Sequence, residues 1–212
     1  MNKISLLLSP DWKDYSLRDS GDGKKLERFG KFSFVRPEPQ AMWEPKFSQE
    51  LWEEADGAFI SLGEEGGGKW KLKKTLPARW QMEYKDLKFW VRPTPFRHIG
   101  IFPEQVILWD FACRKIKESG RQANILNLFG YTGLAALAAA SEGASVTCVD
   151  ASPRVLAWAR ENQVLSGFGQ KPIRWIQEDA LKYTRREVRR GMKYDGFIID
   201  PPKFGRGPKG EV

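Results

Sequence analysis

Cysteine, histidine and long apolar segments are all scarce in this chain. Its 212 residues contain two cysteines, Cys113 and Cys148, and a single histidine, His98. The cysteines lack the spacing of metal ligands and are too few for a disulfide framework, so we expect neither a metal site nor disulfide bonds. Cys148 also lies inside an apolar run, where burial would make its thiol inert.

Apolar runs are short throughout, and charge of one sign is in excess. No segment has the roughly 18 consecutive apolar residues that a membrane-spanning helix requires. Met1 to Pro10 has neither the length nor the small-residue cleavage site of a signal peptide, which predicts a cytoplasmic protein without membrane association. The net charge of +8 favours a polyanionic partner, for which nucleic acid is the natural candidate.

The first part of the chain is rich in Trp, Pro and Gly and has no long helical pattern. Its short alternating stretches are typical of strands, and turn signals such as Asp22-Gly23 separate them. The glycines at 66–68 precede no helical pattern, so we expect a hairpin turn there rather than a phosphate-binding loop. Residues 1–96 are therefore predicted to form a small β-rich domain. The expected strands cover residues 31–36, 58–62, 70–72, 79–84 and 87–92.

Residues 97–212 have a different pattern, in which four apolar runs alternate with helical stretches. Such uninterrupted runs are typical of buried parallel strands, so we predict an α/β domain with a Rossmann-like sheet that ends after its fourth strand. The first run covers residues 124–128 and the second ends at Asp150. The third ends before Asp179 and the fourth before Asp200. Because ligands bind beyond the carboxyl ends of such strands, these ends mark the predicted site.

The first run leads into the loop Phe129-Gly130-Tyr131-Thr132-Gly133, and a helix of small residues, 134–141, follows at once. This arrangement is typical of nucleotide-cofactor binding. Dinucleotide enzymes need Gly-x-Gly-x-x-Gly, whose first glycine is missing here, so the spacing disfavours NAD. Asp150 suits either cofactor class, since a carboxylate at that strand end can accept both ribose hydroxyls of an adenosine.

Four motifs in order resemble those of one family. They are Leu-Asn-Leu-Phe-Gly-Tyr-Thr-Gly (126–133), Val-Asp-Ala-Ser (149–152), Glu-Asp-Ala (178–180) and Ile-Ile-Asp-Pro-Pro-Lys-Phe (198–204). Together they look like the class I S-adenosylmethionine-dependent methyltransferases and, more narrowly, the bacterial ribosomal RNA large-subunit cytosine-C5 methyltransferase group. The resemblance covers residues 98–204. It implies S-adenosylmethionine as cofactor, RNA as partner and a part in ribosomal RNA processing.

The resemblance also implies roles for individual residues. Gly130 and Gly133 would let the backbone approach the methionyl end of the cofactor, Asp150 would hold the ribose hydroxyls, and Asp179 would accept a hydrogen bond from adenine. Asn127, where many relatives carry Asp, would orient a water or the cofactor's amino group. The implied cofactor-binding residues are Phe102, Gln105, Asn127, Phe129, Gly130, Tyr131, Thr132, Gly133, Asp150, Ala151, Ser152, Asp179 and Ala180.

The implied catalytic residues are Asp200, Pro201 and Pro202, since two prolines hold the backbone rigidly at the mouth of the site. Lys203 and Phe204 would then meet a phosphate and stack on a base. Methylation of cytosine C5 also needs a cysteine thiolate that adds to carbon 6. Neither cysteine is placed for this step, so we expect the nucleophile beyond Val212. The chain that ends there, whether a fragment or a truncated form, is then expected to be inactive on RNA.

Two alternatives stay open: methylation of an exocyclic base amine or a small molecule, with Asp200 taking the proton, and a form that binds cofactor or RNA without catalysis. By its position, the N-terminal domain is expected to help dock RNA. Ser152 and Pro153 should start a helix that packs Val155, Trp158, Ala159 and Asn162 in the core.

The predicted helix 180–190 carries Arg185, Arg186, Arg189 and Arg190 on its solvent side. These arginines indicate either a solvated face or contacts to RNA phosphates. A fourth strand without a neighbour would be an exposed edge that favours self-association.

Overall fold

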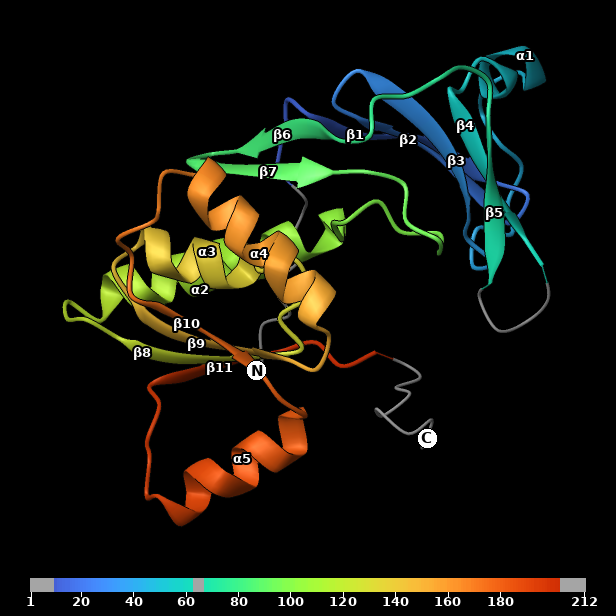
Figure 1. Ribbon diagram of the computed structural model, residues 1–212. Helices are drawn as coiled ribbons and strands as arrows, with labels where there is room; N and C mark the ends of the chain where they lie inside the picture. The colour runs from blue at the N-terminus through green and yellow to red at the C-terminus, as the bar shows by residue number, and fades with distance from the viewer. Residues whose placement is uncertain (1–9, 63–66, 203–212) are drawn as a thin grey trace, which may run out of the picture. The chain divides into compact units, whose positions relative to one another are not determined.

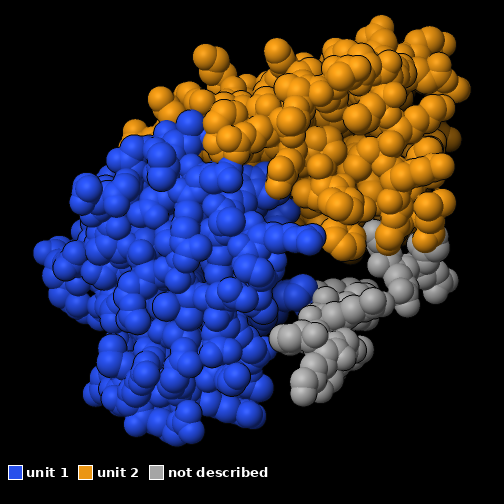
Figure 2. All heavy atoms as spheres, in the orientation of Figure 1, with its two compact units in different colours: residues 1–10, 104–212 blue, residues 11–103 orange. Residues whose placement is uncertain are grey.

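The chain forms two compact units, one of residues 11–103 and one that joins residue 10 to the residues from 104 onward (Figure 2). The computed structural model describes residues 10–62 and 67–202. The predicted boundary at residue 96 lies inside the first unit. Residues 97–99 continue its pairing, because the Arg92 N–H donates to the Ile99 carbonyl and the Thr94 N–H to the His98 carbonyl. We call the two parts the N-terminal and C-terminal units.

The N-terminal unit contains a five-stranded sheet in the order β1-β2-β3-β4-β5. Neighbouring strands are antiparallel except for β3 and β4, which are parallel. A separate antiparallel pair, β6 and β7, follows (Figure 1). The elements are β1 (Tyr15–Gly21), β2 (Lys24–Phe29), β3 (Phe32–Pro37), α1 (Gln49–Glu53), β4 (Gly57–Ser61), β5 (Gly68–Leu72), β6 (Trp80–Tyr84) and β7 (Leu87–Val91).

All five predicted strands of this unit are present, as β3 to β7, with ends that shift by one or two residues. The sequence analysis missed β1, β2 and the single-turn helix α1. Asp22-Gly23 is the two-residue turn between β1 and β2, and both of its φ angles are positive, at 50° and 70°. Such a turn twists with its strands and forms a tight hairpin. The predicted turn at 66–68 lies partly outside the described residues, although β4 and β5 pair antiparallel on either side of it.

A buried ion pair lies in the aromatic core of this unit. Arg36 donates from Nε and Nη2 to the two carboxylate oxygens of Glu27, each at 2.7 Å. The Tyr15 hydroxyl also donates to Glu27, and Arg36 Nη1 donates to the Arg97 carbonyl. These additional bonds offset the desolvation of the two charges, which a bare pair would not.

The C-terminal unit has a four-stranded sheet in the order β10-β9-β8-β11, and every pair in it is parallel. This confirms the predicted Rossmann-like fold class. Among the described residues, β11 is an outer strand that pairs with β8. The elements are α2 (Val106–Glu118), β8 (Asn124–Leu128), α3 (Leu134–Ser141), β9 (Ser145–Asp150), α4 (Pro153–Leu165), β10 (Ile173–Gln177), α5 (Ala180–Arg189) and β11 (Gly196–Ile199).

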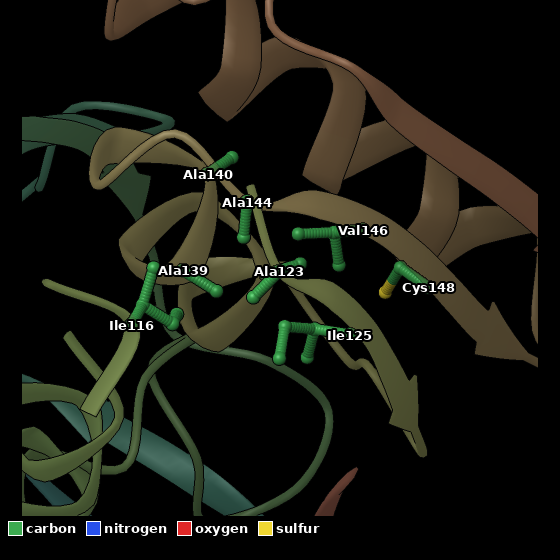
Figure 3. Close-up of a cluster of buried hydrophobic side chains, with 9 residues drawn as sticks. Ile116, Ala123, Ile125, Ala139, Ala140, Ala144, Val146 and Cys148 are labelled. Carbon is green, nitrogen blue, oxygen red and sulfur yellow. The ribbon is translucent and has the colours of Figure 1, made fainter. Parts of the chain in front are cut away.

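Helices cover both faces of this sheet. In Figure 1, α2, α3 and α4 lie on one face and α5 on the other. On the first face, Ile116 of α2 and the alanines of α3 pack against Ile125, Val146 and Cys148 of the strands (Figure 3). On the second face, Tyr183 of α5 packs with Leu126 and Val149. Alternate residues of β8 thus enter different cores, which explains why its apolar residues do not alternate with exposed polar ones.

The strand order reverses between β8 and β11, because β9 and β10 follow on one side of β8 and β11 lies on the other. In open parallel sheets this reversal separates the loops beyond the strand ends and leaves a crevice where ligands bind. No helix within the described residues is long and apolar enough to cross a membrane.

Candidate active site

A short loop with unusual backbone angles joins β8 to α3 at the point of strand reversal. Phe129 and Tyr131 have positive φ angles of 58° and 47°, and Gly133 has one of 81°. Such angles are unfavourable for residues other than glycine and persist only where the surroundings fix them. Here the Gly130 N–H donates to the Val149 carbonyl at 3.1 Å, and the Gly133 N–H donates to the Gly130 carbonyl at 2.8 Å.

Both glycines of this loop pack tightly against the protein itself. A Cβ atom on Gly130 would overlap the Cys148 sulfur, and one on Gly133 would lie 2.6 Å from the Trp175 ring and 2.7 Å from Ala159. The expected approach to a cofactor is therefore not the only demand for glycine. Close packing of the loop on β9, β10 and α4 requires it as well.

Asp150, the last residue of β9, ties this loop to the next strand end. Its Oδ2 accepts the Tyr131 N–H at 3.0 Å, and its Oδ1 accepts the Ser152 N–H at 2.8 Å. Each carboxylate oxygen keeps further acceptor capacity, so the group can hold the loop and still bind hydroxyls. Ala151 lies exposed between these contacts. Ser152 occupies the predicted N-cap of α4, with Pro153 after it, but its side chain makes no capping bond.

The third strand end, after β10, is held by the start of α5. Asp179 is the N-cap residue, and its Oδ1 accepts the Lys182 N–H at 2.8 Å. Ala180, the first helical residue, is buried. Glu178 accepts a hydrogen bond from Arg186 Nη1 at 3.1 Å. The prediction that Arg186 faces solvent is therefore wrong: its guanidinium is half-buried against Glu178 and over the Tyr183 ring.

Asn127 lies beneath the loop, with 2% of its surface exposed. Its Nδ2 donates to the Ile198 carbonyl of β11 at 3.1 Å and to the Leu128 carbonyl at 3.3 Å. This amide links the two strands that flank the reversal, which a carboxylate could not do without a proton. Contact between Asn127 and a cofactor or water stays a prediction.

The fourth strand end carries Asp200, Pro201 and Pro202, which follow β11 directly and are exposed. Parallel strands place their carboxyl ends at one edge, so these residues share that edge with residues 129–133, Asp150 and Asp179. Lys203 and Phe204 lie outside the described residues. Of the two upstream residues, Phe102 belongs to the N-terminal unit and packs edge-on against His98 at 4.8 Å. Gln105 precedes α2 and is half-buried.

Two residues that the sequence indicated only as core or left unremarked position the loop. Asn162 of α4 is fully buried, and its Nδ2 donates to the Thr132 carbonyl at 3.0 Å. Trp175 of β10 supports Gly133, and its Nε1 donates to Gln163 Oε1 at 2.7 Å. The one available signal was an amide on an otherwise apolar helix face, because buried amides need partners. Val155, Trp158 and Ala159 are core residues as predicted, with Val155 half-buried.

Each cysteine thiol makes a hydrogen bond within the C-terminal unit. Cys148 is fully buried, and burial, together with the Asp150 charge, raises the pKa of its thiol well above the usual range. Cys113 donates to the Ala138 carbonyl at 3.2 Å. In residues 10–62 and 67–202, no group of three or more His, Cys, Asp or Glu side chains gathers as metal ligands.

Comparison with known proteins agrees with this geometry. Residues 111–207, a little under half of the chain, match the family described as Conserved hypothetical protein 95. The ribosomal RNA large subunit methyltransferase K/L of Methylococcus capsulatus is 36% identical over 123 residues, which are 58% of this chain and 16% of that protein. The protein of the same name from Shewanella oneidensis is 38% identical over 125 residues. The chain thus spans about a sixth of the length of these relatives.

Solved structures extend the likeness to both units. The S-adenosylmethionine-dependent methyltransferase from Agrobacterium tumefaciens is 48% identical, with a TM-score of 0.88 over 94% of this chain and 63% of that one. A methyltransferase complexed with S-adenosylhomocysteine, SMU.776, is 20% identical with a TM-score of 0.72 and supports the fold alone. Fold and comparisons identify the chain as a homologue of the class I S-adenosylmethionine-dependent methyltransferases, as predicted. S-adenosylmethionine is the cofactor of that class.

Proposed function

We propose that the protein transfers a methyl group from S-adenosylmethionine to a base of RNA, and that the RNA is ribosomal. One observation carries the proposal: the strained loop 129–133, the carboxylate of Asp150 and the exposed Asp200 lie at one edge of the sheet, where the strand order reverses. An adenosine cofactor needs a ribose-binding acid beside a backbone loop, and a methyl acceptor needs a polar group across from it. The N-terminal unit is proposed to help dock the RNA, as the sequence analysis expected of residues 1–96.

The residues at this edge fit S-adenosylmethionine. Asp150 retains acceptor capacity for two ribose hydroxyls, and Asp179 presents a second carboxylate at the next strand end. The N-terminus of α3, which begins at Leu134, supplies backbone donors that suit the cofactor's carboxylate. When bound, the cofactor supplies the electrophilic methyl group, so the protein has only to align and desolvate the acceptor.

RNA as the substrate rests on charge and on the relatives' names. The net charge of +8 favours a polyanion, and the sequence relatives are named as ribosomal RNA methyltransferases. A base rather than a phosphate or sugar is proposed because Asp200, Pro201 and Pro202 offer a carboxylate and rigid carbonyls, which match the hydrogen-bond donors of a base edge.

The predicted acceptor is C5 of cytosine, and the two cysteines limit this proposal. A thiolate must add to carbon 6 before C5 becomes nucleophilic. Cys148 is buried with a raised pKa, and the Cys113 thiol is bonded to a helix carbonyl. A thiolate for this chemistry would have to come from outside these 212 residues, which contain no third cysteine.

The burial of Cys148 and the hydrogen bond of Cys113 favour a second candidate acceptor, the exocyclic amine of a base. An amine already carries the electron pair that attacks the methyl group and needs no covalent adduct. The exposed Asp200 carboxylate can accept hydrogen bonds from the amine and take up the proton that it loses.

Calorimetry and methyl transfer test these proposals. The chain should bind S-adenosylmethionine and not NAD; binding of NAD alone would overturn the class of cofactor. Transfer of labelled methyl groups to total RNA, followed by nucleoside analysis, then separates the acceptors. Labelled 5-methylcytosine supports the C5 proposal, and a methylated exocyclic amine supports the second. Label in protein or small molecules but not in RNA would contradict both.

A further inference from the structure

The N-terminal unit displays an aromatic ring and a cation side by side at the tip of one loop. We call Pro95, Phe96 and Arg97 the tip. All three residues are exposed, and the Phe96 side chain is one of the large apolar groups left in solvent, with 60% of its surface exposed. Single exposed apolar residues are common, so exposure alone indicates nothing. The way in which this loop is held is more informative.

Hydrogen bonds fix the backbone on both sides of the tip. The Thr94 N–H donates to the His98 carbonyl at 3.0 Å, and the Thr94 hydroxyl donates to the same carbonyl at 2.8 Å. Trp70 Nε1 donates to the Thr94 carbonyl at 2.8 Å and to the Phe96 carbonyl at 3.1 Å. A bridge to Gly67 adds a further link at Phe96. The ring is therefore presented on an ordered backbone, and a ligand that binds it pays little conformational entropy.

The charge at the tip is positive and uncompensated. The neighbouring Arg36 and Lys25 are paired with Glu27, at 2.7 Å and 3.8 Å respectively. Arg97 differs, because no acidic group within the described residues lies at ion-pair distance from its guanidinium. Its backbone carbonyl is also fixed, since it accepts a hydrogen bond from Arg36 at 3.2 Å. The tip thus offers one unpaired cation beside one exposed ring.

We propose that the tip binds single-stranded RNA, with a base stacked on the Phe96 ring and a neighbouring phosphate paired with Arg97. Every base has a π-face that can stack on an aromatic ring, and its phosphate lies close enough for an adjacent cation to reach. A duplex hides its base faces and should not use the ring. The inference rests on the proposed function, because RNA is the proposed substrate.

Fluorescence anisotropy with a short labelled single-stranded RNA, and with the same sequence as a duplex, tests this contact on the full chain. Phe96→Ala should weaken single-strand binding about five-fold or more and leave duplex binding unchanged, since stacking is lost. Phe96→Tyr should keep the affinity, whereas Phe96→Leu should not, because leucine is apolar but cannot stack. Arg97→Ala should lower the slope of log affinity against log salt by about one.

Met42→Ala and Lys13→Ala are matched controls, since they remove an exposed apolar group and an exposed cation elsewhere in the same unit. Both should leave the ring-dependent binding intact. Equal affinities for Phe96→Ala and the controls, equal losses with single strand and duplex, or no binding by the unaltered chain would each overturn the inference. Calorimetry with S-adenosylmethionine on the same proteins keeps the proposed function separate: intact cofactor binding with an inert tip rejects only the RNA contact.

Discussion

At the scale of single residues, Asp150 serves two purposes that one substitution removes together. Its carboxylate holds the loop through the Tyr131 and Ser152 N–H groups and is the proposed ligand of the ribose. Asp150→Ala should weaken S-adenosylmethionine binding about tenfold or more, since each lost bond to a charged group costs about 1.5–3 kcal/mol. Calorimetry measures the effect. Unchanged affinity in a folded variant would remove Asp150 from the site.

Asn162 holds the same loop through its side-chain amide, and substitution by Asp replaces this neutral donor with a titratable group. Asn162→Asp places a carboxylate against the Thr132 carbonyl, where the amide now donates at 3.0 Å. Burial raises the pKa of such an acid, and only its protonated form can donate. We expect cofactor affinity to fall about tenfold near neutral pH and to recover as the pH is lowered.

Asn162→Ala is the control for this effect, because it removes the bond without adding a titrating group. Its cofactor affinity should be weak and should not recover in acid. Calorimetric titrations across pH compare the two variants. If Asp and Ala at position 162 behave alike at every pH, the bond to the loop does not position the site.

At the scale of elements, α5 carries arginines of two kinds, some in ion pairs and others exposed to solvent. Arg186 is bonded to Glu178 and lies over Tyr183, whereas Arg185 and Arg189 point into solvent. Arg185→Ala with Arg189→Ala should reduce the salt dependence of RNA binding and leave the melting temperature nearly unchanged. Arg186→Ala should leave the salt dependence of RNA binding nearly unchanged and lower the melting temperature, because it leaves Glu178 without this partner. Anisotropy and thermal melting distinguish the double variant from the single one. An unchanged salt slope in the double variant would mean that Arg185 and Arg189 only form a solvated surface.

The elements also explain which parts of the fold the sequence could predict. The strands β8 and β9 are apolar runs because both faces of the sheet are covered, and α3 was predicted with its observed ends. By contrast, β1 and β2 alternate charged residues with few large apolar ones, so their pattern resembles a loop. Their pairing depends on the Asp22-Gly23 turn and on a core made by distant strands. Local sequence does not contain that information.

The candidate site divides in the same way. Residues 129–133, Asp150, Asp179 and Asp200 were predictable because polar ends of apolar runs must meet at one sheet edge. The loop contacts of Asn162 and Trp175, and the inward turn of Arg186, depend on partners from other elements. Spacing along one element cannot reveal a partner on another.

At the scale of the whole molecule, the two units should respond differently to acid. His98, the single histidine, lies in the N-terminal unit, and its buried Nδ1 has no hydrogen-bond partner among the described residues. Burial, followed by the charges of Arg36, Arg97 and Lys25, lowers the pKa of His98 to about 4. In the unfolded chain the imidazole would bind a proton near pH 6.5. Unfolding is therefore accompanied by proton uptake between about pH 6.5 and 4.

Stability of the N-terminal unit should therefore fall as the pH drops from about 6.5 to about 4, where the unfolded chain holds the proton and the folded unit does not. The contribution of His98 is at most about 3 kcal/mol, and water at the partly exposed ring reduces it. Six of the nine tryptophans, Trp12, Trp43, Trp52, Trp70, Trp80 and Trp90, lie in this unit and report its unfolding by fluorescence. Because carboxylates also titrate in this range, the informative quantity is the difference from His98→Gln. The variant should lose less stability than the unaltered chain between pH 6.5 and 4, and parallel curves would mean that His98 takes up its proton without cost in the folded unit.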